Sequence, residues 1–257
     1  MKIKSLGFIG GGRITRIFLQ AFENKKASWD DVVVYDTDEE TASKLKQQFP
    51  DVTIAKTSAE AAQCDVVFIA LHPLVIVETL AGIKGHVNEN AIIVSLAPKI
   101  TIEKMRGILG IPNVMRLIPN ATSIINEGYN PFCFADGFDS SRKIEILSII
   151  DITGKAFETD ETKLEAYAII SAMLPTYFWF LLKTHVDLEK DIDPKIDDTS
   201  QTVMQTMDAA THLRFSAGMS YEAVSDLIPV KPIGEHEKEI KQILETKLSG
   251  LYQKIKP

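Results

Sequence analysis

A glycine-rich tract near the N-terminus constrains this chain more than any other feature. Residues 4–15 read Lys-Ser-Leu-Gly-Phe-Ile-Gly-Gly-Gly-Arg-Ile-Thr, and apolar residues with helical spacing follow. A pyrophosphate requires a strand, a tight glycine turn and a helix in this order, because Gly10 can take the turn conformation and Gly12 lets the phosphates approach. The helix start adds unpaired N–H groups and a positive dipole end. Thr15 replaces the third glycine of the fingerprint, so a glycine turn without a ligand stays the alternative.

An acidic residue at the expected distance supports a dinucleotide site. Residues 31–36 indicate a second buried strand, which ends in Asp36, 24 residues after Gly12. The dinucleotide fold places an acid about 20 residues on, where it bonds the ribose hydroxyls. Asp36 can also cap the helix that begins near Asp38, and the two roles are compatible. The acids of residues 36–40 repel a 2′-phosphate and therefore favour NAD(H) over NADP(H). Arg13, a cation beside the turn, favours NADP(H) instead, because it could reach that phosphate.

Composition is that of an ordinary globular protein. Of 257 residues, 45% are hydrophobic and 25% are charged. A net charge of −7 argues against nucleic acid as a partner. Two cysteines, Cys64 and Cys133, predict a reduced intracellular setting, and a strand at the very N-terminus leaves no room for a signal peptide. We therefore expect a cytoplasmic protein.

One segment has the composition of a membrane span. Residues 166–182 are apolar or aromatic apart from Ser171, Pro175 and Thr176. The segment is short for a span, and Pro175 lies in its middle. We interpret it as a core helix at a subunit interface, with no membrane as partner.

The pattern along the chain predicts two domains. Strands alternate with helices over residues 1–160, which indicates a Rossmann-type, doubly wound parallel sheet that binds a dinucleotide. The strand pattern is absent from residues 161–257, and we expect them to form an all-helical domain. The helical stretches expected there are residues 162–188, 194–214 and 235–253.

These landmarks resemble the pyrroline-5-carboxylate reductase family over nearly the whole chain. The family's G-F-I-G-x-G-N-M-A segment corresponds to residues 7–15, its V-K-P segment to residues 71–73, and its R-x-M-P-N segment to residues 116–120. The resemblance implies an N-terminal dinucleotide domain, a C-terminal helical dimerisation domain, and a homodimer or a multiple of dimers. The cofactor-binding residues predicted from the turn, the acid and the resemblance are Gly10, Gly11, Gly12, Arg13, Ile14, Asp36, Leu71, His72, Pro73 and Asn120.

The substrate end departs from the family. Its S-G-S-G-P-A-Y segment corresponds to residues 171–177, where Pro175 and Tyr177 remain but both glycines are replaced. Its T-S-P-G-G-T-T loop, which holds the substrate carboxylate, corresponds to residues 227–235, which keep one glycine and no hydroxyl. Each lost donor removes about 1.5–3 kcal/mol from a charged partner. Candidate substrate residues are Pro175, Tyr177, Lys231, which offers one replacement charge, and Gly234.

Candidate catalytic residues are few. His72 ends a central strand, where open sheets bind ligands, and it equally suits a structural turn. Asn120 follows another strand and is a candidate for contact with nicotinamide or substrate. The histidines at 185, 212 and 236 lack metal-ligand spacing, and the acidic run of residues 187–198 is typical of a solvated loop, so no metal site is expected.

The leading hypothesis is an NAD(P)-dependent reductase that delivers hydride to a C=N or C=O carbon of a small substrate, with a remodelled substrate site. In the family reaction the imine is protonated before it is reduced, so no dedicated acid is required. One alternative is a deazaflavin-dependent NADP oxidoreductase. The other is a non-catalytic dinucleotide-binding regulatory protein.

Overall fold

The computed structural model describes residues 3–193, 195 and 198–256. The chain divides into two compact units. Unit 1 runs to Met173 and includes the residues from Tyr252 onward, and unit 2 comprises Leu174–Leu251.

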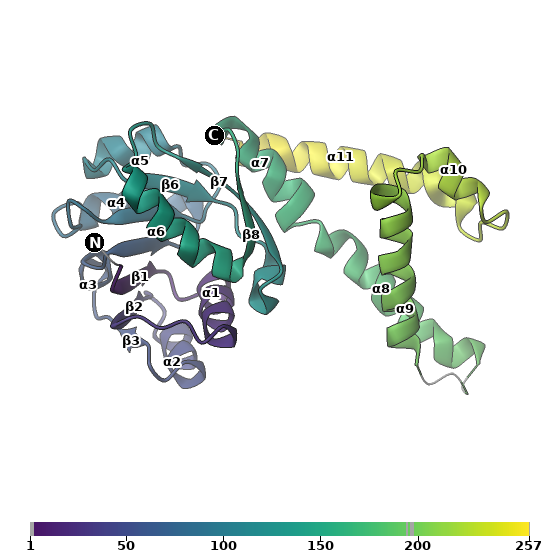
Figure 1. Ribbon diagram of the computed structural model, residues 1–257, viewed down its shortest axis with the longest axis horizontal. Coiled ribbons are helices and arrows are strands. Elements are labelled where there is room, and N and C mark those ends of the chain that lie inside the picture. Colours follow the sequence, from purple (N-terminus) through teal and green to yellow (C-terminus); the bar gives the residue numbers. More distant parts are fainter. Residues whose placement is uncertain (1–2, 194, 196–197, 257) are drawn as a thin grey trace. The chain divides into compact units, whose positions relative to one another are not determined.

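Unit 1 is built on a twisted sheet with the strand order β3-β2-β1-β4-β5-β6-β7-β8 (Figure 1). Its strands are β1 (Ser5–Ile9), β2 (Asp31–Tyr35), β3 (Thr53–Ile54), β4 (Val66–Ile69), β5 (Ile92–Ser95), β6 (Val114–Leu117), β7 (Gly128–Phe134) and β8 (Gly154–Glu158). All pairings from β3 across to β6 are parallel. The strand order reverses between β1 and β4, so the predicted doubly wound α/β class is confirmed.

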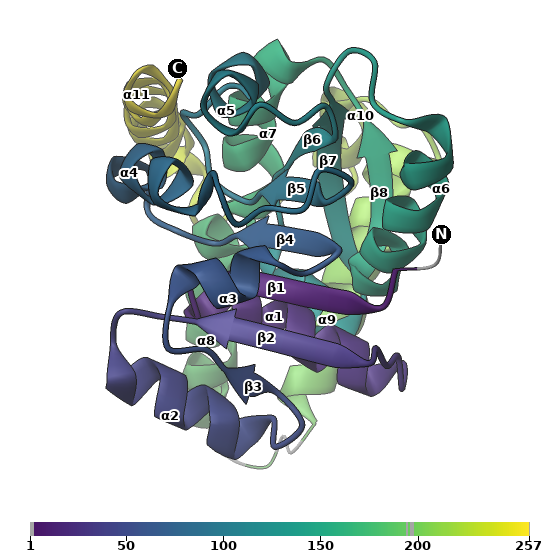
Figure 2. The same cartoon turned by 90° about the vertical axis from the view of Figure 1, so that its left-hand side faces the viewer.

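Helices cover both faces of the sheet. They are α1 (Arg13–Asn24), α2 (Glu39–Gln48), α3 (Ser58–Ala62), α4 (Pro73–Ile83), α5 (Ile102–Leu109), α6 (Ser140–Ile150) and α7 (Leu164–Tyr167). Shorter turns are η1 (Ala121–Ile125), η2 (Asp151–Thr153), η3 (Glu161–Lys163) and η4 (Ala168–Ala172). Helices α3, α4 and α5 pack side by side on one face, and α1 lies on the other with η1 and η2 (Figure 2).

The core forms where the central strands meet α1. The rings of Phe8 in β1 and Phe68 in β4 stack with centroids 4.6 Å apart, and Phe18 of α1 lies 5.4 Å from Phe68. All three rings are fully buried. Because β4 and β5 are buried at every position, their uninterrupted apolar sequences are those of parallel strands covered on both faces.

The sheet departs from an all-parallel arrangement at β7. This strand pairs antiparallel with β6 and parallel with β8. The connection from β6 to β7 contains only the turn η1, which is too short for the crossover that a parallel neighbour requires. The predicted doubly wound parallel sheet is therefore mostly parallel, and β6 with β7 forms its antiparallel pairing.

A buried ion pair attaches the segment after β8 to the sheet. Arg116 of β6 is fully buried and pairs with Glu165 of α7, whose side chain is 2% exposed, and with Glu161 at 3.1 Å. Glu161 also accepts from the backbone N–H of Ile102 at 2.8 Å. Strands end at Glu158, close to the predicted domain boundary at residue 160, but these contacts keep the following residues in unit 1 as far as Met173.

Unit 2 is helical, as the sequence predicts. Its elements are α8 (Pro175–Ile192), α9 (Thr199–Thr211), η5 (His212–Ser216), α10 (Tyr221–Asp226), η6 (Gly234–His236) and most of α11 (Glu237–Ile255). The sequence did not predict α10, and Pro194, the expected start of the second helical stretch, lies outside the described residues. The expected helix over residues 162–188 is interrupted at Met173 and Leu174, directly before Pro175.

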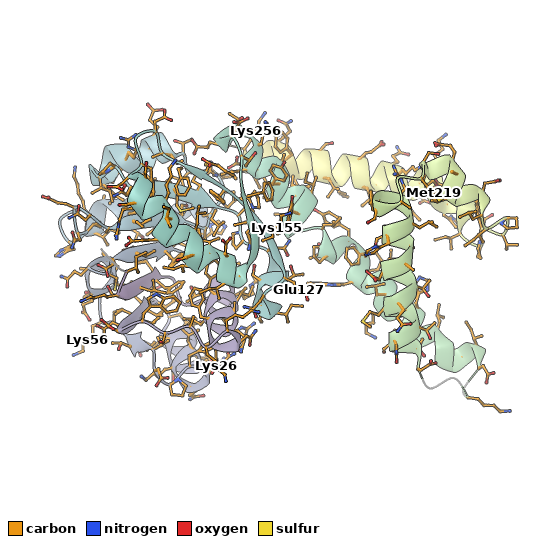
Figure 3. The ribbon with its side chains drawn as sticks, viewed as in Figure 1. Lys26, Lys56, Glu127, Lys155, Met219 and Lys256 are labelled. Atoms are coloured by element: carbon orange, nitrogen blue, oxygen red, sulfur yellow. The ribbon has the colours of Figure 1, made fainter. Side chains whose placement is uncertain are left out.

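Residues 166–182, expected to be a core helix at a subunit interface, are mostly exposed or half-buried in the single chain, and the interface stays a prediction. Side chains stand out from α8 and α9 along most of their length (Figure 3). Trp179 is 49% exposed and Phe180 is 60% exposed. The run Glu161–Leu188 is long and apolar enough to cross a membrane, and 28% of its most apolar window is buried.

Candidate cofactor site

The candidate site lies at the carboxyl edge of the sheet, where the strand order reverses. Strands β1 and β4 are parallel neighbours, with Ile9 paired to Ile69, so the segments that follow them emerge side by side. Gly10 follows β1, and Leu71 and His72 follow β4. Open α/β sheets bind their ligands at such a switch point.

The glycine turn after β1 requires Gly10. This residue has φ +104°, and a Cβ there would lie 2.4 Å from the carbonyl oxygen of Ala70. Its N–H donates to the carbonyl of Tyr35 at 2.8 Å, and its own carbonyl accepts from the hydroxyl of Thr15. Thr15, which replaces the last glycine of the fingerprint, is buried and stabilises the turn through this hydrogen bond.

Asp36 contacts the same turn. One carboxylate oxygen accepts from the N–H of Gly11 at 2.6 Å, and the other accepts from the N–H of Asp38 at 2.9 Å. The helix α2 is capped by Asp38, whose side chain accepts from Glu40 and Thr41, so Asp36 is not its cap. Each oxygen of Asp36 keeps a second lone pair for a ribose hydroxyl.

The start of α1 fits an anionic group. Gly12 is the N-cap of α1 and has no side chain that could accept from the first N–H groups of the helix. The first turn, which includes Arg13 and Ile14, contains no acid. A Cβ added to Gly12 would meet no protein atom within 4 Å, so the space beside the turn is open. The N–H groups and dipole of α1 therefore face a space that a pyrophosphate can enter.

A small hollow beside this turn contains Arg13, which the sequence predicted, and two further cationic side chains that it did not. Its volume is about 220 Å³, and its lining includes Gly12, Arg13, Arg16 and Lys44. Arg16 follows Arg13 at helical spacing, a signal present in the sequence. Lys44 pairs with Glu40 at 2.6 Å, so part of the positive charge is already neutralised.

The segment after β4 begins a helix. His72 is the exposed cap of α4, with Nδ1 accepting from the N–H of Leu74 at 3.5 Å, and Pro73 is the first helical residue. Leu71 contacts the glycine turn, since a Cβ on Gly10 would lie 3.3 Å from its side chain. The structure thus brings Leu71 and His72 next to the turn and gives His72 a capping role there.

Asn120 follows β6 at the same edge of the sheet. It is 6% exposed, and its amide contacts Thr122 and Ser171. It caps the turn η1 through Oδ1. Ser171 begins the segment that corresponds to the family's S-G-S-G-P-A-Y, and its contact with Asn120 was not predicted from the sequence.

The candidate substrate residues lie in unit 2. Lys231 and Gly234 line a groove of about 530 Å³ whose other walls include Ile228, Val230 and Ile233. Pro175 and Tyr177, at the start of α8, are not among the residues that line it. Partial burial raises the pKa of Tyr177, which keeps its hydroxyl protonated near neutral pH.

Among the described residues, neither a thiolate near neutral pH nor a metal-ligand cluster is found. Burial raises the pKa of the Cys64 thiol to about 11 and that of Cys133 to about 12, so neither is a thiolate near neutral pH. Within the described residues, no group of three or more His, Cys, Asp or Glu side chains is arranged to hold a metal ion.

Comparison with known proteins agrees with this geometry. Residues 5–99 match the family described as NADP oxidoreductase coenzyme F420-dependent. A pyrroline-5-carboxylate reductase from Corynebacterium melassecola is 22% identical over 254 residues, which is 96% of this chain and 93% of that protein. The enzyme of the same name from Escherichia coli (strain K12) is 24% identical over 190 residues, 72% of this chain and 69% of that protein.

Solved structures show the same fold. The pyrroline carboxylate reductase of Plasmodium falciparum, determined with NADP bound, superposes with a TM-score of 0.81 at 19% identity and covers 99% of this chain and 97% of its own. The 1-pyrroline-5-carboxylate reductase of Streptococcus pyogenes gives a TM-score of 0.80 at 16% identity, with 98% of both chains covered.

Proposed function

We infer that the chain is a member of the pyrroline-5-carboxylate reductase family, a family of NAD(P)-dependent oxidoreductases, and that it reduces a small C=N or C=O substrate. The observation that carries the proposal is the turn after β1. Gly10 is held in a conformation that suits glycine, Gly11 is fixed by Asp36, and the start of α1 is open beside Gly12. When bound there, the nicotinamide cofactor supplies the hydride.

The protein's own part is binding and orientation. The N–H groups at the start of α1 bind the pyrophosphate, and Asp36 accepts from the adenosine ribose while it holds Gly11. Leu71 and His72 follow β4 and lie beside the turn, where the bound cofactor would pass. His72 is exposed and is the candidate that can pass a proton to the reduced substrate.

The family match over residues 5–99 favours one second candidate, a coenzyme F420-dependent NADP oxidoreductase. Both candidates use the same dinucleotide site and differ in the second reactant. A cofactor-oxidation assay with cyclic imines and keto acids, run beside one with a deazaflavin, separates them. A dinucleotide-binding protein that turns over none of these would be the non-catalytic alternative.

Substitution of Gly12 tests the proposed site. Gly12→Val places a branched side chain in the open space beside the turn, so it should abolish dinucleotide binding and leave the fold intact. Calorimetry with NADH and NADPH measures the first effect, and circular dichroism the second. Gly10→Ala is the comparison for stability. Its Cβ would meet the Ala70 carbonyl, so this variant, unlike Gly12→Val, should lose about 2 kcal/mol or more in the free energy of unfolding. Unchanged affinity in a folded Gly12→Val protein would refute the site.

The loop of residues 229–234 leads us to propose a substrate other than pyrroline-5-carboxylate. Its groove is lined mainly by aliphatic side chains, with Lys231 as a point charge and Lys241 paired to Glu237 at 2.6 Å. A carboxylate bound there would lack several hydrogen-bond donors. We expect weak or absent turnover of pyrroline-5-carboxylate, measured as cofactor oxidation under saturating substrate. Turnover within about tenfold of the Escherichia coli enzyme would contradict this expectation.

A further inference from the structure

The helical path between the sheet and α8 is broken at a defined place. The turn η4 (Ala168–Ala172) is a π-helix, in which the N–H of Met173 donates to the carbonyl of Ala168 at 3.0 Å. An uninterrupted α-helix would bond the N–H of residue 175 to the carbonyl of Ser171. Residue 175 is proline and has no N–H, so the Ser171 carbonyl loses its α-helical donor, although the N–H of Met173 is also directed at that carbonyl.

Asn120 supplies a donor at that position. Its Nδ2 lies 3.2 Å from the carbonyl oxygen of Ser171 and 3.3 Å from the Ser171 hydroxyl. The other end of the amide, Oδ1, accepts from the N–H and the hydroxyl of Thr122, both at 3.1 Å. Both ends of the amide are thus engaged with protein, and 6% of the residue is exposed.

Asn120 is itself held by the sheet. Its backbone N–H donates to Oδ1 of Asn130 at 2.9 Å, and Asn130, in β7, is fully buried and bonded to Thr153. Ser171 has a second attachment, because its hydroxyl donates to the carbonyl of Tyr129 at 3.0 Å. The helix break is therefore joined to the end of β6 and to β7 through one amide and one hydroxyl.

We propose that Asn120 is a positioning residue, whose amide replaces the backbone N–H that Pro175 lacks and latches the helix break to the carboxyl end of β6. The latch fixes the point at which the chain leaves unit 1, two residues beyond Ser171. Direct contact of this amide with nicotinamide or substrate would require Nδ2 to leave Ser171. The connection to catalysis rests on the proposed function, whereas the latch does not.

A double-mutant cycle tests the latch. The four full-length proteins are wild type, Asn120→Ala, Pro175→Ala and the double variant, compared by amide hydrogen exchange in peptides that cover residues 168–176. Loss of one hydrogen bond should raise exchange in this segment about fivefold in Asn120→Ala. In the Pro175→Ala background the same change should raise it less than about twofold, because the N–H restored at position 175 donates to the Ser171 carbonyl. Pro50→Ala, at an exposed proline after α2 and away from this segment, is the control and should not rescue Asn120→Ala.

Equal effects of Asn120→Ala in the two backgrounds, or no effect in either, would overturn the proposal. If Asn120→Ala does not fold, Asn120→Asp gives the same information, because its carboxylate places an acceptor against the Ser171 carbonyl and should raise exchange in this segment above the carboxyl pKa. Dinucleotide affinity of the same set gives a second readout. A loss that persists in full in the double variant would assign Asn120 to direct contact, whereas an unchanged or rescued affinity supports the latch. The exchange result stands even if Gly12→Val reveals no dinucleotide site.

Discussion

Asp36 has a role in the turn that bears on the choice of dinucleotide. Its carboxylate accepts from the N–H groups of Gly11 and Asp38, yet its negative charge stays beside the proposed position of the ribose. Arg13 and Arg16 offer compensating charges in the neighbouring hollow. The acids of residues 36–40 outnumber these cations, so we keep the expectation that NAD(H) binds more tightly than NADP(H).

Comparing the dissociation constants of NADH and NADPH by calorimetry tests this expectation. Arg13→Ala with Arg16→Ala removes both arginines of the hollow and should leave NADH affinity within about threefold, because the turn N–H groups remain. Tighter binding of NADPH, lost in that double variant, would show that the two arginines hold the 2′-phosphate and outweigh Asp36.

The conformation or position of Gly10 and Asp36 follows from local chain geometry and could be predicted from the sequence. Gly10 was predicted for its turn conformation and has a positive φ, and Asp36 was expected at the end of β2, where it lies. Contacts between distant segments were beyond such reasoning. Nothing within residues 116–120 indicates that Asn120 bonds Ser171, 51 residues away, because that contact depends on how β6 and η4 meet.

At the scale of elements, the spacing of apolar residues predicts that a helix forms but does not show where it is interrupted. Apolar residues continue through residues 162–188, but the helix stops at Met173 and restarts with Pro175. Pro175 argues against a membrane span, but the break in the helix directly before it was not predicted. The antiparallel β7 was missed for a similar reason, because the apolar pattern of a strand carries no direction.

The buried pair of Arg116 and Glu165 holds α7 on the sheet, and its removal should be costly. Glu165→Ala leaves the Arg116 charge buried with Glu161 as its remaining carboxylate partner, so we expect a loss of about 3–5 kcal/mol in the free energy of unfolding. Urea denaturation measures it. The double variant Arg116→Met with Glu165→Met should lose less, since no charge is stranded. A loss below about 1 kcal/mol in Glu165→Ala would mean that the pair does not hold α7 in place.

At the scale of the whole molecule, the described residues of unit 2 form no buried core of their own. Helices α9 and α10 contain no buried residue, and Phe215 is 75% exposed. Monomers rarely leave apolar patches beyond a few hundred Å² in water. We propose that a second copy of the chain covers this surface, through an interface of roughly 2,000 Å² or more.

Sedimentation at micromolar concentration tests this assembly. A dimer of the 28.6 kDa chain, or a multiple of it, is expected. Phe180→Asp introduces a charge into the exposed face of α8 and should shift the protein toward monomers, whereas Ile144→Asp, at a 74% exposed position on α6 of unit 1, should not. A wild-type protein that sediments as a monomer would contradict the proposal. It would also revive the alternative that Glu161–Leu188 lies against a bilayer, because an apolar surface of that length must be covered by protein or by lipid.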